Sequence, residues 1–206
     1  MKSKRRYLAA LIMMMILCLF AGVNTHAASK GQRAISTYKK VLPKGKIAYK
    51  SGNKKYNLKI KKFALVDINQ DGVKEAIFAD EYGISFVLCT YNGKKVVVLK
   101  KDGTWQGSGW RYNAEEKSLC YSPTATIANQ KDVFLKVSKN KAKVTTIQLV
   151  NGSKYYKNGK KVSRSTYNSV AKIGTSGDMK YIKTYKNNAS NRKKISSLSY
   201  VVSKWW

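Results

Sequence analysis

The sequence is short of the residues on which most hydrolytic enzymes depend. It has one histidine, His26, beside 41 lysines and arginines and only 10 acidic residues. His26 falls in an N-terminal segment, residues 1–27, that has the layout of a cleaved leader. A chain without that segment has no imidazole, which excludes Ser/His/Asp triads, Cys/His dyads and histidine-based zinc sites.

The leader is predicted from the order of charge and hydropathy at the N-terminus. Four basic residues precede an uncharged apolar run at residues 8–23, and small residues follow around Ala27. The run is 16 residues long, whereas a membrane-spanning helix needs about 20. Export with cleavage after Ala27 is therefore favoured over a retained membrane anchor. We expect a secreted, extracellular protein, either free or associated with the cell wall.

Cysteine is also scarce, with two residues, Cys89 and Cys120, outside the leader. Export takes both into a compartment where a disulfide can persist, so a bridge between them is one interpretation. The alternative is two buried free thiols in neighbouring strands. Their spacing alone does not decide between the two.

Short β-type segments make up most of the remaining chain. Gly31–Leu42 has apolar residues at helical spacing, and Ser163 can cap a second helix that ends near Gly174. Elsewhere the period is that of strands separated by polar turns, of which Asn92-Gly93 is the strongest hairpin signal. The expected strands cover 56–66, 76–79, 84–91, 96–99, 110–112, 119–121, 133–137, 144–149, 155–156, 181–185 and 198–202.

Acidic residues are few, yet half of them gather in one stretch. Five of the ten lie between positions 67 and 81, and like charges this close repel one another unless a cation lies among them. Calcium takes six to eight oxygen ligands. Counting from Asp67, oxygen-bearing side chains stand at positions 1, 3, 5 and 9, with Gly72 at position 6. The predicted ligands are the side chains of Asp67, Asn69, Asp71 and Glu75 and the backbone carbonyl of Val73.

The alternative is a solvated hairpin turn with no metal, because Asp, Asn and Gly favour turns for local reasons. The first half of the loop matches the EF-hand pattern, but position 12, where an EF-hand has a bidentate Glu, is Phe78. The exit from the loop is also β-like. An ordinary EF-hand is therefore not expected.

The loop resembles the calcium-binding hairpin loops of FG-GAP and integrin-propeller repeats and the opening of dockerin loops. The stretch 63–79 as a whole is similar to a segment of uncharacterised secreted proteins from Gram-positive gut bacteria. This resemblance implies that Asp67, Asn69, Asp71 and Glu75 are side-chain ligands and that Val73 gives its carbonyl. We expect the calcium to be structural. It names no activity. The loop occurs once, whereas propellers and dockerins repeat it.

The excess of positive charge predicts a second property. Without the leader, the net charge of +31 loses four basic residues and becomes +27. Such a chain binds polyanions, and salt weakens that binding steeply. For an exported protein the available polyanions are teichoic acids, anionic glycans and anionic lipid surfaces, and nucleic acid is not expected. The alternative is that the lysines only solvate strands and discourage edge pairing.

An aromatic cluster interrupted by glycines is a further candidate site. Trp105, Trp110, Tyr112 and Tyr121 could form a platform on which a ligand such as a sugar stacks. The alternative is that these rings belong to the core, where aromatic residues of strands are usually found.

Together these features predict an α+β protein in which residues 28–206 form one domain, an antiparallel β meander with two short helices. We expect a calcium-stabilised binding or adhesion protein without catalytic activity. One alternative is a carbohydrate-active enzyme that uses Asp80, Glu81 or Asp102. Another is a dockerin-like module that binds a protein partner.

Overall fold

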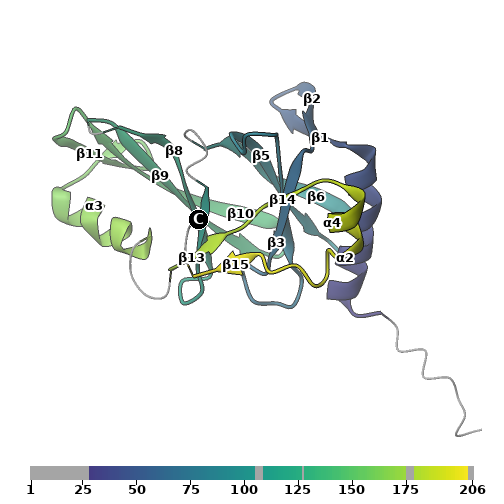
Figure 1. Cartoon of the computed structure of the whole chain (residues 1–206). Helices are drawn as coiled ribbons and strands as arrows, with labels where there is room; N and C mark the ends of the chain where they lie inside the picture. Colours follow the sequence, from purple (N-terminus) through teal and green to yellow (C-terminus); the bar gives the residue numbers. More distant parts are fainter. Residues whose placement is uncertain (1–27, 105–108, 127, 175–178, 204–206) are drawn as a thin grey trace, which may run out of the picture.

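The computed structural model describes residues 28–104, 109–126, 128–174 and 179–203. Within these ranges, antiparallel strands form three sheets and three short α-helices lie around them (Figure 1). The predicted β-rich α+β class is confirmed. The prediction of one continuous meander is wrong, because the strands divide into a two-stranded, a five-stranded and an eight-stranded sheet.

The first helix in the described ranges, α2 (Lys30–Val41), agrees with the predicted helix to within one residue at each end. Ser29 caps it: its hydroxyl accepts a hydrogen bond from the Gln32 backbone N–H, and the Gln32 side chain accepts one from the Ser29 N–H. The helix buries Ala34 and Tyr38, and a short 3₁₀ turn, η1 (Leu42–Lys44), follows it. Helix α2 therefore lies along one side of the molecule with its lysines in solvent (Figure 1).

A two-stranded hairpin follows, made of β1 (Lys46–Ser51) and β2 (Lys54–Lys59). One of its faces is turned toward the core, where Leu58 is buried and the rings of Tyr49 and Tyr56 stack 5.6 Å apart. The other face carries lysines in solvent. The predicted strand 56–66 is divided, since β2 ends at Lys59 and a new strand begins at Lys62.

The five-stranded sheet has the order β14-β3-β4-β5-β6, so four consecutive strands form a meander and β14 joins its edge. All five residues of β4 are buried, as are six of the seven in β5. Strands covered on both faces read as continuous apolar runs, which is the pattern seen here. The strands are β3 (Lys62–Val66), β4 (Glu75–Ala79), β5 (Ser85–Tyr91), β6 (Val96–Gly103) and β14 (Tyr185–Lys186).

The eight-stranded sheet has the order β12-β11-β10-β9-β8-β7-β13-β15. Its first six strands form a second meander, and β13 and β15 extend it beyond β7. The strands are β7 (Trp110–Asn113), β8 (Ser118–Ala125), β9 (Gln130–Ser138), β10 (Lys141–Val150), β11 (Lys154–Lys157), β12 (Lys160–Lys161), β13 (Met179–Ile182) and β15 (Val201–Val202).

Aromatic residues join the two larger sheets. Phe86 of β5 makes edge-to-face contacts with Trp110 of β7 and Tyr121 of β8, at centroid distances of 5.3 and 4.9 Å. All three rings are buried in one hydrophobic cluster. Packing one sheet on the other buries both inner faces, which a single open sheet of this many strands would leave exposed. The chain therefore leaves the five-stranded sheet after β6 and enters the eight-stranded sheet at β7, and these aromatic side chains pack between the two sheets.

Two further helices complete the fold. The predicted second helix is present as α3 (Arg164–Ala171), capped by Ser163 and continued by the 3₁₀ turn η2 (Lys172–Gly174). A short helix, α4 (Ala189–Lys193), was not expected from the sequence. None of the helices within the described ranges is both long and apolar enough to cross a membrane.

Candidate functional site

The acidic loop connects β3 to β4, and the pairing of Val66 with Glu75 closes it, as the sequence predicted for a hairpin. Helix α2 contacts this loop at two points. The Tyr38 hydroxyl donates a hydrogen bond of 2.9 Å to the Lys74 carbonyl. Gly31 abuts the carbonyl oxygen of Gly72 so closely that a Cβ atom at position 31 would collide with it. Only glycine fits at this contact.

The side chains of the loop are held together by short-range hydrogen bonds. The Asp67 carboxylate accepts from the backbone N–H groups of Asp71, at 3.1 Å, and Gly72, at 2.9 Å. Asp71 accepts from the Val73 N–H at 2.9 Å and from the Asn69 amide at 3.1 Å. Three of the predicted calcium ligands, Asp67, Asn69 and Asp71, therefore lie in one hydrogen-bonded cluster at the surface.

Glu75 is placed differently from the other predicted ligands. Its side chain is buried, and its carboxylate accepts hydrogen bonds of 3.0 Å from the Ile68 N–H and from the Thr90 hydroxyl. Burial raises the pKa of Glu75 to about 7, more than the two hydrogen bonds lower it, and the negative charges of Asp71 and Asp67 raise it further. Both oxygens of Glu75 are thus engaged inside the protein.

The donor set fits a calcium ion in part. Within residues 28–104, 109–126, 128–174 and 179–203, no three side chains of the types His, Cys, Asp and Glu converge on one point that could hold a metal ion. The oxygens of Asp67, Asn69 and Asp71 have the right chemistry and lie together. A fourth side-chain ligand would require Glu75 to turn away from Ile68 and Thr90.

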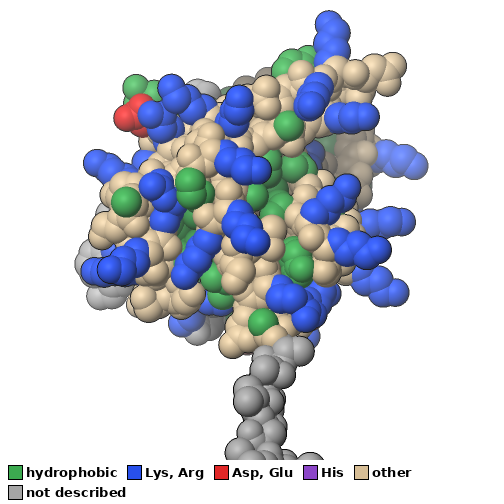
Figure 2. All heavy atoms as spheres, turned by 90° about the vertical axis from the view of Figure 1, so that its right-hand side faces the viewer, with side chains coloured by type: hydrophobic (Ala, Val, Ile, Leu, Met, Phe, Trp, Pro, Cys, Tyr) green, Lys and Arg blue, Asp and Glu red, His purple; other side chains and the backbone are tan. Residues whose placement is uncertain are grey.

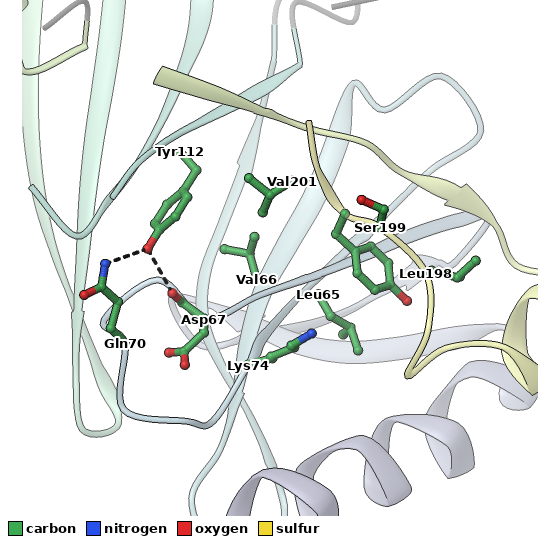
Figure 3. A pocket seen from close by; sticks show the side chains of 10 residues that line it. Leu65, Val66, Asp67, Gln70, Lys74, Tyr112, Leu198, Ser199 and Val201 are labelled. Atoms are coloured by element: carbon green, nitrogen blue, oxygen red, sulfur yellow. Dashed lines mark hydrogen bonds between the residues drawn. The ribbon is translucent and has the colours of Figure 1, made fainter. Parts of the chain in front are cut away.

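Two residues anchor the loop to the eight-stranded sheet. The Tyr112 hydroxyl donates to the Asp67 carbonyl at 3.2 Å and accepts from the Gln70 amide at 3.3 Å (Figure 3). Gln70 also donates to the Ala114 carbonyl at 2.8 Å, and its backbone has a φ of 60°. Sequence reasoning missed Gln70, because its partners lie more than forty residues away along the chain.

A pocket of about 450 Å³ opens beside the loop. Figure 3 shows Asp67 and Gln70 on one side of it, Leu198 and Val201 on the other, and Lys74 between them. The Lys74 ammonium lies 6.0 Å from the centroid of the Tyr200 ring, at the edge of cation–π range. The pocket therefore combines an apolar wall with one cation and one carboxylate.

The aromatic residues do not form the exposed platform that was one interpretation of the sequence. Trp110 and Tyr121 are 3% and 1% exposed and belong to the core, and the Tyr121 hydroxyl donates to Asp102 at 2.7 Å. Tyr112 is also buried, with its hydroxyl engaged by the acidic loop. Trp105 lies outside the described residues. The rings of Trp110 and Tyr121 are therefore packed between the two larger sheets and are not exposed for stacking on a ligand.

Cys89 and Cys120 are free thiols, so the disulfide considered from the sequence is not formed. Cys89 lies in β5, within the cluster that fills the space between the two larger sheets. Cys120 lies in β8 and faces a second cluster, under helix α3. The bridge is not formed because the two side chains point into different parts of the core.

The three acids considered for an enzyme have different surroundings. The Asp80 carboxylate accepts from the backbone N–H groups of Ile84 and Ser85, both at 2.9 Å, and so stabilises a turn. Asp102 accepts from Tyr121 and forms an ion pair of 3.4 Å with Lys100. Glu81 is exposed. The first two therefore have structural partners.

Positive charge is concentrated at the N-terminal side of the fold. Residues 28–66 contain twelve lysines and arginines and no acidic residue. They make up helix α2, the β1–β2 hairpin and strand β3. Figure 2, which views the molecule from the side on which α2 lies, shows Lys and Arg side chains scattered across the face, apolar side chains between them, and very little acidic surface.

Comparison with known proteins found no family model, no curated protein and no solved structure that matches this chain.

Proposed function

We propose that this is an exported protein that binds anionic polymers of cell-envelope or host surfaces, with a calcium ion stabilising its acidic loop. The observation that carries the proposal is the charge of residues 28–66, which contain twelve lysines and arginines and no acidic residue. The side of the molecule on which helix α2 lies carries far more basic than acidic side chains (Figure 2). A polyanion is attracted to such a face, and its binding releases counterions. The leader-like residues 1–27 support delivery to the outside of the cell.

The binding is tested with a polyanion pull-down across a salt series. Immobilised teichoic acid, an anionic glycan and anionic vesicles should each retain the purified protein at low salt and release it as salt rises. A neutral dextran support is the control. Retention that is equal on the neutral support, or that does not change with salt, would contradict the proposal.

The calcium is proposed to be held by the side chains of Asp67, Asn69 and Asp71 and the carbonyl of Val73, with Glu75 as a further ligand if its carboxylate turns outward. An ion there would neutralise the loop and link its two ends. The three surface side chains that already share hydrogen bonds support this assignment. Its role would be structural.

Thermal melting tests the calcium site. With a dissociation constant of about 0.5 mM, 5 mM calcium should stabilise the protein by about 1.4 kcal/mol, which raises the Tm by roughly 3–5 °C. Asp71→Ala should abolish the shift, whereas Glu81→Ala, which removes an exposed acid outside the loop, should keep it. Equal responses of the wild type and Asp71→Ala would refute the site.

A further inference from the structure

The outward face of the β1–β2 hairpin places lysines directly opposite one another. In the register of this hairpin Lys46 faces Lys59, and Lys50 faces Lys55. Side chains opposite each other in an antiparallel pair lie on the same face, with Cβ atoms about 4.5–5.5 Å apart. The hairpin therefore carries two lysine pairs, here called rungs, on one face. The rungs are four residues apart along the strand, or about 13 Å.

These four lysines are exposed, and none of them forms an ion pair with another residue that the structure describes. The ion pairs found among the described residues involve other lysines and arginines, and residues 28–66 contain no acid. Like charges directly opposite in a strand pair destabilise it. A hairpin that breaks this rule twice on one face, without a compensating partner, has the character of a functional site.

Lysines also face each other elsewhere in the fold, as between Lys62 and Lys186, between Lys136 and Lys143, and between Lys157 and Lys160. In the second of these pairs Lys136 forms an ion pair of 2.9 Å with Glu116, so its charge is compensated. The hairpin differs from these in carrying two lysine pairs without ion-pair partners between the same two strands. An anion between the two ammonium groups of each rung would remove the repulsion.

We propose that these two rungs are the binding site for a linear phosphodiester polymer, with one phosphate at each rung. This inference rests on the polyanion binding proposed above and locates it. Two anion positions about 13 Å apart suit a chain with repeated charges better than a single small anion. The exposed residues between the rungs are Ala48 and Asn57, which offer no ring for stacking.

The aromatic residues of the hairpin lie on its other face. Tyr49 and Tyr56 stack on each other there, at an interplanar angle of 19°. Sugars and nucleobases are commonly held by stacking on aromatic rings, and the lysine face has none. The surface therefore favours a polyol phosphate chain, recognised by charge alone, over a nucleic acid or a polysaccharide.

Two double variants of the full protein test the rungs, and each of them lowers the net charge by the same two units. Lys46→Gln/Lys50→Gln removes one lysine from each rung, and Lys50→Gln/Lys55→Gln removes both lysines of one rung. The control, Lys139→Gln/Lys154→Gln, removes two exposed lysines that do not face another lysine. The probe is poly(glycerol phosphate), with single-stranded DNA and heparin measured in parallel.

If each rung binds as a unit, the first variant should bind poly(glycerol phosphate) about fivefold more weakly than the second, because it disables both rungs. The control should bind more tightly than either. Equal losses in all three variants would overturn the rungs but leave polyanion binding intact, whereas a wild-type protein that binds no polyanion would overturn both. The same difference between variants with DNA or heparin would overturn the assignment to a phosphodiester chain without bases.

The Tm of each variant separates binding from folding. Removing a lysine from a rung relieves repulsion, so both rung variants should be at least as stable as the wild type. A lowered Tm in either variant would contradict the proposed uncompensated repulsion.

Discussion

The two hairpins at the start of the fold are opposites. The β3–β4 hairpin is buried on both faces and carries its charge in a connecting loop, where acidic side chains accept hydrogen bonds from the backbone and from the Asn69 amide. The β1–β2 hairpin is mostly exposed and carries its charge on one strand face, where lysines meet lysines. The β3–β4 hairpin therefore contributes mainly to stability. In the β1–β2 hairpin the facing lysines repel one another, and a bound anion would reduce that repulsion.

This difference locates the two proposed ions. A cation would be bound where backbone and helix α2 already fix the loop. Anions would be bound where side chains are long, exposed and free to adjust. Substitutions in the β3–β4 hairpin, here called the inner hairpin, should therefore change the free energy of unfolding. Substitutions in the β1–β2 hairpin, here called the outer hairpin, should change the affinity for polyanions.

The largest effect is expected in the inner hairpin. Phe78 is fully buried and makes an edge contact with Tyr38 at 6.1 Å. Phe78→Ala should lower the free energy of unfolding by about 3–5 kcal/mol, because it leaves a cavity. The matching change in the outer hairpin, Tyr56→Ala at a ring that is 43% exposed, should cost about 1 kcal/mol or less. Urea denaturation measures both, and similar losses would remove the contrast.

The pH dependence of Glu75 is the next largest effect. Burial raises its pKa from 4.5 to about 7 in the folded protein, so the folded state holds this proton more tightly than the unfolded chain. Stability from this group is therefore greatest below pH 4.5 and falls as the pH rises toward 7, by at most about 3 kcal/mol.

Glu75→Gln keeps the shape of the side chain and removes the titration. With a calcium chelator present, the variant should become more stable relative to the wild type as the pH rises from 4.5 to 7. Above pH 7 the difference in unfolding free energy should stay constant. Urea denaturation at several pH values measures it. If the difference in unfolding free energy does not change with pH, burial in the folded protein does not raise the pKa of Glu75.

The smallest effect is expected in the outer hairpin, and it has the opposite sign. Lys50→Thr removes one member of a like-charged pair and should raise the free energy of unfolding by a few tenths of a kcal/mol at low salt. Lys141→Thr, at a strand position that faces Ser138, is the control for strand propensity. The gain at position 50 should shrink at high salt, and an equal gain at both positions would attribute it to propensity alone.

The sequence was sufficient for the features that depend on local pattern. The helix at α2, the strands on either side of the acidic loop and the cap of α3 follow from spacing, turn residues and capping residues. The strand break at Lys59 was missed, because the apolar pattern continues through Ile60 and gives no local signal.

Features that depend on distant partners could not be predicted. The split of the meander depends on Phe86 meeting Trp110 and Tyr121 across two sheets, which no local pattern reveals. Glu75 was predicted as a ligand from its place at position 9 of the loop, and its hydrogen bonds with Ile68 and Thr90 inside the protein could not be read from that spacing. The facing lysines became visible only once the register of β1 and β2 was known.

The separated thiols have a consequence for their reactivity. Burial raises the pKa of both, that of Cys120 to about 11, so its reactive thiolate fraction at neutral pH is on the order of one in ten thousand. Neither the core nor the acidic loop depends on a covalent link between Cys89 and Cys120. A reducing agent therefore has no bond between these two residues to break.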